Sequence, residues 1–347
     1  MPRFYLTSDY DISRVIKGGW QLAGGHGQVH LQDALEDMLQ YVKAGITTFD
    51  CADIYTGVEE LIGAFLRRHK HAFGTDELPS VQIHTKYVPD LSALSRLSRQ
   101  DVEKVIDRSL TRLGLDRLDL VQFHWWDYDT PRYVEAALHL KALQGAGKIR
   151  HIGVTNFDVM HLKDITDAGV TIVSNQVQYS VLDQRPEGEM TDFCHEHDIV
   201  LLCYGTLAGG FVTDSYRRTP EPRTPHENRS LTKYALIIDD TGGWSTFQET
   251  LDILREVADK HKVDIADVAT RYVMQKPRVA AAIVGSRNAR YLVNTSKLFT
   301  FELDSDDLSA IRRQVSQTNG LLGEVYGIER IKEGKHAGIM KYDLNKD

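Results

Sequence analysis

The sequence predicts an α/β fold in which eight parallel strands close into a (β/α)8 barrel. Short β-branched or apolar runs alternate with stretches that have helical spacing. Glycines separate several helical stretches from the strands that follow, where a left-handed helix end suits glycine: Gly45, Gly114, Gly147 and Gly169. The repeated short crossovers imply a parallel sheet, and eight such units close most economically into a barrel.

The eight strands are expected at a weak run, 14–17, and at seven clear ones: 47–50, 81–86, 118–124, 149–154, 171–176, 199–204 and 279–284. Helices with one apolar face are expected at 31–42, 58–66 and 102–113, and a last helix at 305–317. An open, doubly wound sheet is the competing fold. It usually carries G-x-G-x-x-G after its first strand, and residues 24–27 do not complete that spacing.

The length of 347 residues would allow two domains at ~150 residues each, but a single barrel with insertions can also be this long. We therefore expect a single barrel domain over residues 1–318. Residues 213–244 break the alternation with prolines and charges, and we expect a long, lid-like loop there, after the seventh strand. Residues 319–347 are expected to form a C-terminal tail that either covers the barrel mouth or stays mobile.

Composition narrows the class of partner. Forty-one Lys and Arg against 49 Asp and Glu leave a net charge of -8, which argues against binding to nucleic acid or to an anionic membrane. No apolar stretch approaches the ~18 to 20 residues of a membrane span. Three widely spaced cysteines favour neither a disulfide framework nor a cysteine-rich zinc site. We expect a cytoplasmic protein, a monomer by default, that acts on a small molecule.

Residues able to carry chemistry stand at the ends of three successive predicted strands. These are Asp50, Lys86 and His124, and Tyr55 follows Asp50 by five residues. In such a barrel the working residues lie where strands end, so the four side chains can converge. Each alone has a structural explanation: a turn cap, a solvated lysine, a buried histidine. Their occurrence together at matching strand ends favours a catalytic site.

This combination suits proton delivery to an oxygen that gains negative charge. An ammonium group near a phenol favours the phenolate and lowers the pKa of the tyrosine, while a carboxylate holds the ammonium in place. A neutral imidazole can orient a carbonyl by donating a hydrogen bond to its oxygen. No side chain supplies a hydride, so reduction would require a nicotinamide cofactor.

The chain resembles the aldo-keto reductases in several motifs that occur in the order typical of that family. The motifs cover about residues 14–297 and are Phe49-Asp50-Cys51-Ala52-Asp53-Ile54-Tyr55, His84-Thr85-Lys86, Asp119 to Trp125, Lys148 to Phe157 and Asn175 to Tyr179. The resemblance implies a TIM barrel and reversible reduction of aldehydes or ketones. It implies Tyr55 as the proton donor, Lys86 and Asp50 as the pair that tunes it, and His124 as the residue that orients the carbonyl.

The resemblance also implies where the cofactor binds. Thr155, Asn156 and Gln176 match residues that bind the nicotinamide carboxamide, and Tyr204 matches a ring that stacks on the nicotinamide. Without the resemblance, Asn156 would be read as a helix cap and Tyr204 as a core residue. The loop after the seventh strand is expected to hold the pyrophosphate through Gly205, Thr206, Leu207 and Gly209.

The loop after the eighth strand favours NADP(H) over NAD(H). Gly285, Ser286 and Arg287 open a short helix, and backbone N–H groups with a guanidinium suit an adenosine 2′-phosphate. The chain departs from many family members later in this helix, at Tyr291, Asn294 and Thr295, which weakens that preference.

Aromatic residues near the reactive centre predict a pocket for an apolar, aromatic or sugar-ring carbonyl compound. They are Trp20, Trp125 and Trp126, although tryptophans are also common in cores. Cys51 could make the site sensitive to oxidation, but an inert buried thiol is the simpler interpretation. The identity of the carbonyl substrate is not predicted.

Two rival functions stay open. A metal-dependent hydrolase would need a His-x-His pair on the first strand, and residues 14–17 contain none. The cluster Cys194 to His197 lies in a helical stretch, where adjacent side chains point away from each other, so no metal site is expected there. A redox-sensing subunit that binds the cofactor with little turnover would keep all four catalytic residues, and the sequence does not separate it from an enzyme.

Overall fold

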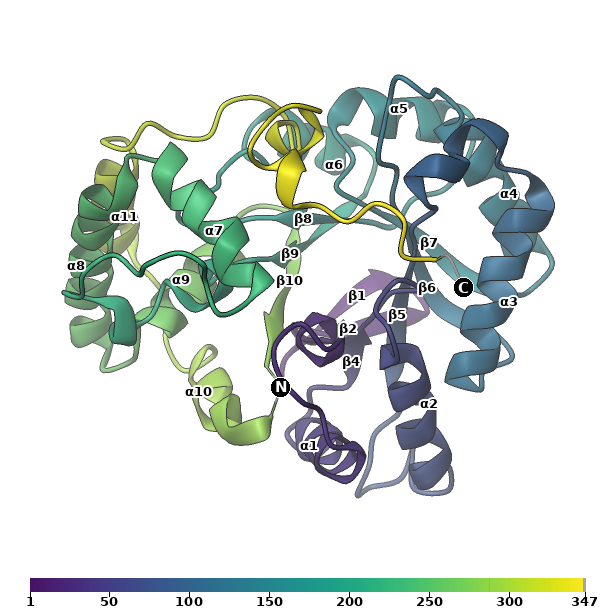
Figure 1. Ribbon diagram of the computed structural model, residues 1–347. Helices are drawn as coiled ribbons and strands as arrows, with labels where there is room; N and C mark the ends of the chain where they lie inside the picture. Colours follow the sequence, from purple (N-terminus) through teal and green to yellow (C-terminus); the bar gives the residue numbers. More distant parts are fainter. Residues whose placement is uncertain (287, 346–347) are drawn as a thin grey trace.

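A computed structural model describes residues 1–286 and 288–345 and shows the predicted barrel (Figure 1). Eight parallel strands close in the order β10-β3-β4-β5-β6-β7-β8-β9. Their bounds are β3 Val15–Gly18, β4 Thr48–Asp50, β5 Gln82–Tyr87, β6 Leu118–Phe123, β7 Ile149–Thr155, β8 Ser174–Gln178, β9 Val200–Tyr204 and β10 Val279–Gly285. Each predicted strand is found, and the largest error is at β8, which begins three residues later than expected.

The helices surround the barrel and bury their apolar faces against it. Their bounds are α1 Leu31–Lys43, α2 Val58–His69, α3 Arg99–Leu113, α4 Tyr133–Gly145, α5 Val159–Asp167, α6 Glu189–Glu196, α7 Arg229–Asp240, α8 Gly243–His261, α9 Ile265–Met274, α10 Leu292–Lys297 and α11 Ser305–Val315. The four glycines expected after helices all have positive φ, between 70° and 82°. No helix in the described part of the chain is long and apolar enough to cross a membrane.

An N-terminal hairpin, which the sequence analysis did not predict, lies at the end of the barrel opposite the chemical residues. It consists of β1 Arg3–Thr7 and β2 Tyr10–Ser13. Tyr10 is buried, and its hydroxyl lies 3.1 Å from Nε2 of His84, which is on β5 two residues before Lys86. The hairpin therefore closes this end of the barrel.

The segment 213–244 is not a loop throughout. It contains a short 3-10 turn, Asp214–Tyr216, and the helix α7, which Asn228 caps through a 3.0 Å bond to the Leu231 N–H. Leu231, Tyr234 and Ile237 of α7 are buried, so tertiary packing stabilises this helix. It was not predicted, because prolines and charges in the segment indicated a loop. In Figure 1, α7 lies at the same end of the barrel as the tail.

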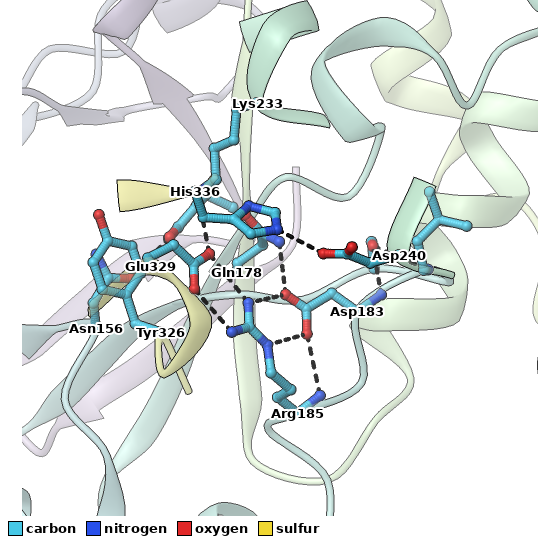
Figure 2. Close-up of polar contacts among 12 residues, drawn as sticks. Asn156, Gln178, Asp183, Arg185, Lys233, Asp240, Tyr326, Glu329 and His336 are labelled. Atoms are coloured by element: carbon cyan, nitrogen blue, oxygen red, sulfur yellow. Dashed lines mark hydrogen bonds and ion pairs between the residues drawn. The ribbon is translucent and has the colours of Figure 1, made fainter. Parts of the chain in front are cut away.

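The tail packs against the barrel mouth rather than extending into solvent. It carries two short 3-10 turns, Ile328–Arg330 and Ala337–Ile339. Figure 2 shows how it is held: the buried guanidinium of Arg185 lies between Asp183, at 2.7 Å, and Glu329 of the tail, at 2.9 Å. His336 of the tail bonds Asp240 of α7 at 2.6 Å. A buried ion pair is costly to break on one side, so the tail is firmly fixed.

The ion pair between Arg185 and Glu329 predicts that the free energy of unfolding depends on pH. Burial raises the pKa of Glu329, but the Lys233 and Arg185 cations lower it more, and the net value is about 2 against 4.5 for an ordinary glutamate. Because the pKa is lower in the folded state, the stabilisation is complete above about pH 4.5 and is lost as the pH falls toward 2. Unfolding by urea should show Glu329→Gln to be destabilised at pH 7 and nearly equal to wild type near pH 2. The exposed Glu333→Gln variant is the control, and equal destabilisation of Glu329→Gln at both pH values would contradict the prediction.

Candidate active site

The four predicted catalytic side chains line one cavity of about 360 Å³ at the end of the barrel where the strands finish. Asp50 is the last residue of β4, Lys86 lies near the end of β5, and His124 directly follows β6. Tyr55 stands in the loop between β4 and α2. Since these three strands are neighbours in the sheet, the strand ends bring the side chains together.

Asp50 and Lys86 form a buried ion pair. The Lys86 ammonium donates to Oδ2 of Asp50 at 2.6 Å and to the Cys51 carbonyl at 2.9 Å, and both side chains are about 95% covered. Burial lowers the pKa of Lys86, but the Asp50 carboxylate and the Tyr55 phenol outweigh that effect and the net pKa is raised. The ammonium is therefore charged at neutral pH.

The Lys86 ammonium lies 5.1 Å from the centre of the Tyr55 ring, close enough to act on a charge that develops on the phenol. The net shift differs from the sequence-based expectation. Burial raises the pKa of Tyr55 above its ordinary value, and Lys86 opposes this without reversing it. The free site therefore holds a protonated phenol, the form that a proton donor requires.

His124 is neutral and its tautomer is defined. Burial lowers its pKa to about 3, with Arg330 and Lys86 acting in the same direction. Its Nδ1 lies 3.1 Å from the Thr155 carbonyl oxygen, which can only accept, so the proton is on Nδ1. Nε2 then carries a lone pair and has no partner among the described residues. In this tautomer the ring accepts a hydrogen bond at Nε2, whereas the sequence analysis expected it to donate one.

Gln122 is a buried site residue that the sequence analysis missed. It lies on β6 two residues before His124, and its amide bonds both Asp50 and Gln176. Side chains two apart on a strand face the same side, so the alternation along β6 held the signal that could have identified it.

The residues predicted to bind the nicotinamide also line the cavity: Thr155, Asn156, Gln176 and Tyr204. The Tyr204 hydroxyl donates to Oδ1 of Asn156 at 2.8 Å, and the Asn156 N–H donates to the Gln176 carbonyl at 2.9 Å. Asn156 does not cap α5, because Asp158 does so through the His161 N–H. Tyr204 is only partly buried and lines the cavity, so it is not a core residue.

The two glycine-containing loops are close to each other at the cavity. Gly205, Thr206, Leu207 and Gly209 line it, as does Gly285 after β10. Gly205 and Gly209 have φ of 77° and 68°, and a Cβ on Gly205 would lie 2.2 Å from the Tyr234 hydroxyl. Ser286 is buried and does not line the cavity; its hydroxyl donates to the Asn288 carbonyl at 2.5 Å. Arg287 lies outside the described residues.

Two of the three predicted pocket tryptophans line the cavity. The Trp20 ring lies 5.1 Å from that of Tyr55, and the Trp126 ring is edge-on to His124 at 4.3 Å. The prediction for Trp125 is wrong: it is fully buried and its indole N–H donates to the carbonyls of Asp127 and Thr130. Trp125 points away from the cavity because the alternation of β6 continues past the end of the strand.

Helix α7 and the C-terminal tail, whose positions local sequence patterns did not predict, complete the cavity walls. Helix α7 contributes Arg229, Lys233 and Tyr234, and the tail contributes an apolar and aromatic wall of Tyr326, Ile339, Met340 and Leu344. Arg330 of the tail donates to the carbonyls of Trp125 and Asn156, at 3.0 and 2.9 Å, which fixes the wall beside His124. Only tertiary contacts place these residues, so local sequence patterns gave no signal for them.

Comparison with known proteins agrees with this architecture. Residues 14–315 match the aldo/keto reductase family. The chain is 28% identical over 246 residues to the NADH-specific methylglyoxal reductase of Escherichia coli, covering 64% of this chain and 72% of the relative. It is 26% identical over 318 residues to an aldo-keto reductase of Bacillus subtilis, covering 89% and 91%, and 25% identical over 282 residues to the aldo-keto reductase yakc [NADP(+)] of Schizosaccharomyces pombe, covering 77% and 78%.

A solved structure shares the fold. The glycerol dehydrogenase of Gluconobacter oxydans superposes with a TM-score of 0.76 over 91% of this chain and 95% of that one, at 22% sequence identity. Because the family match spans nearly the whole barrel, the chain belongs to the aldo/keto reductase family and is an oxidoreductase of that family.

Proposed function

We propose that the chain reduces an aldehyde or a ketone to the alcohol with NADPH, reversibly. The observation that carries the proposal is the cavity itself, where a buried ammonium–carboxylate pair, a protonated phenol and a neutral imidazole lie together. A reduced nicotinamide, when bound, supplies the hydride to the carbonyl carbon. The side chains of this chain supply the proton and the electrostatic stabilisation.

Tyr55 donates its proton to the carbonyl oxygen as that oxygen gains charge. The Lys86 ammonium stabilises the phenolate that remains, and Asp50 keeps the ammonium in position. His124, protonated on Nδ1, lines the cavity beside the substrate, and its Nε2 lone pair takes no part in the transfer, because the single hydroxyl proton of the alcohol is the one exchanged with Tyr55. The apolar walls reduce access of water and strengthen each of these interactions.

The residues around the cavity fit a dinucleotide. Tyr204 offers an aromatic ring, and the loop from Gly205 to Gly209 lines the cavity with backbone angles that favour glycine, while Tyr234 of α7 packs closely against Gly205 and Gly209. Both N–H groups of the Gln176 amide are already used, by Asp50 and Gln122, so its oxygen is the atom that would accept from a nicotinamide carboxamide. These residues would hold the cofactor.

NADP(H) is proposed over NAD(H) on the strength of the Gly285-Ser286-Arg287 sequence, and the named relatives include both an NADH-specific and an NADP(+) enzyme. The substrate is proposed to be an apolar or aromatic carbonyl compound, because Trp20, Trp126, Tyr326 and Met340 line the cavity.

The experiment is a fluorescence titration with NADPH and NADH, followed by turnover with quinones, aromatic aldehydes, aldoses and ketosteroids. We expect tighter binding of NADPH, and NADPH oxidation with at least one aromatic or apolar class. Binding of neither cofactor would reject the proposed function. Tight binding without turnover across the panel would favour the cofactor-sensing alternative.

The protonation state of His124 gives a separate prediction. Because its pKa is lowered to about 3, the imidazole should stay neutral, with the proton on Nδ1, from pH 5 to pH 8. The ¹⁵N resonances of His124, assigned by their loss in His124→Asn, should not titrate in that range. Titration near pH 6, or a proton on Nε2, would show that the Thr155 contact does not define the ring.

A further inference from the structure

We infer that Gln122 is a positioning residue that holds the Asp50–Lys86 pair in its reactive geometry and links the pair to Gln176. The inference rests on the proposed function, because it concerns the same site. Gln122 does not reach the reacting atoms. It acts through Asp50.

The position of Gln122 follows from the sheet register. Gln122 of β6 is paired with Lys86 of β5, so both side chains point into the barrel at the same level. Gln122 is fully buried and Lys86 nearly so. The barrel therefore brings an uncharged amide directly beside a buried ion pair.

The Gln122 amide reaches across β7 to β8, where its Oε1 accepts from Gln176 Nε2 at 2.7 Å. The β7 residue paired with Gln122 is Gly153, and a Cβ there would lie 2.5 Å from the Ser174 hydroxyl of β8. The glycine therefore lets β8 pack closely against β7 at this level.

Each oxygen of Asp50 is held by identified donors. Oδ2 accepts from Lys86 at 2.6 Å, and Oδ1 accepts from Gln122 at 2.9 Å and from Gln176 at 2.7 Å. A carboxylate oxygen accepts hydrogen bonds, and donors on both oxygens prevent rotation of the group. Because the carboxylate is a rigid group, fixing Oδ1 also fixes Oδ2, the oxygen that faces the Lys86 ammonium.

The amide at position 122 performs two tasks. Its N–H donates to the carboxylate while its oxygen accepts from Gln176. A leucine supplies neither contact, and an ionised glutamate would set a second negative charge beside Asp50. The arrangement also leaves only the oxygen of Gln176 for the nicotinamide, so Gln122 contributes indirectly to cofactor orientation.

The test is Gln122→Leu, with Gln122→Met as a second variant of similar shape in case the first folds poorly. We expect kcat to fall by about ten- to a hundredfold, the range for loss of one hydrogen bond to a charged group. The alkaline limb of the kcat–pH profile should move to lower pH, because a loosened Asp50 supports the Lys86 charge less well. The control is Gln314→Leu, a buried glutamine that bonds Thr250 between α11 and α8 at 3.5 Å; it should leave both measurements unchanged.

A double-mutant cycle with Asp50→Asn tests the route of the effect. If Gln122 acts through Asp50, Gln122→Leu should cost little further activity in the Asp50→Asn background. An equal fold-loss in both backgrounds would overturn the inference, as would wild-type kcat and pH profile in a folded Gln122→Leu or Gln122→Met protein.

A readout without turnover separates this inference from the proposed function. The ¹³Cε resonance of Lys86, assigned with Lys86→Met in cofactor-free protein, should titrate at lower pH in Gln122→Leu than in wild type. An unchanged titration overturns the inference even if the wild type reduces carbonyls. If the wild type fails to turn over, the proposed function fails, while the shift of the Lys86 titration still decides the role of Gln122.

Discussion

Replacing Tyr55 with phenylalanine is expected to lower kcat at least about a thousandfold, the upper part of the range for loss of a general acid. The variant removes one hydroxyl and keeps the ring that packs against Trp20 and faces Lys86. The Kd for NADPH should stay within about a factor of two, because the lost interaction exists only in the transition state. Steady-state turnover and a fluorescence titration on the same protein measure the two quantities.

The control for Tyr55→Phe is the melting temperature, which should change little. A kcat within tenfold of wild type would show that another group delivers the proton. A large loss of NADPH affinity with unchanged kcat would instead place Tyr55 in cofactor binding.

Replacing Lys86 with methionine should have the largest combined effect on stability and activity. It leaves the Asp50 carboxylate buried without its cation, and breaking a buried ion pair on one side costs about 3–5 kcal/mol. The double variant Lys86→Met/Asp50→Asn should recover much of that stability, because the uncompensated charge is gone. Neither variant should recover activity. Urea unfolding and turnover of the two variants give these comparisons.

The matched control removes a lysine that ion-pairs at the surface. Lys332 bonds Asp129 at 2.8 Å and is exposed, so Lys332→Met should change stability little. A Lys86→Met protein as stable as Lys332→Met would mean that the Asp50–Lys86 pair does not carry a buried charge.

The sequence was sufficient to predict the barrel and the four chemical residues because both depend on local patterns. Alternating strand and helix periodicities locate the strands. The second, third and fourth strands of the barrel, which are β4, β5 and β6, are neighbours and necessarily end side by side. Asp50, Lys86 and His124 therefore had to converge once the strand ends were known. The same alternation, applied past the end of β6, would have placed Gln122 and Trp126 with His124, and Trp125 on the opposite side.

Other features depend on contacts that are remote in sequence. Helix α7 and the tail take their places through Arg185 and Asp240, whose partners are 144 and 96 residues away. The raised pKa of Tyr55 and the tautomer of His124 follow from burial and from one carbonyl of β7. No periodicity in the sequence encodes those quantities: the lowering of the Tyr55 pKa by Lys86 was predicted, but the larger effect of burial was not.

The most direct test of the whole account is single-turnover absorbance after the NADPH-bound protein is mixed with saturating aromatic aldehyde. We expect first-order loss of the NADPH absorbance, with alcohol formed in equal amount. A protein that binds NADPH and aldehyde together yet leaves the reduced cofactor intact would show that the cavity does not perform carbonyl reduction.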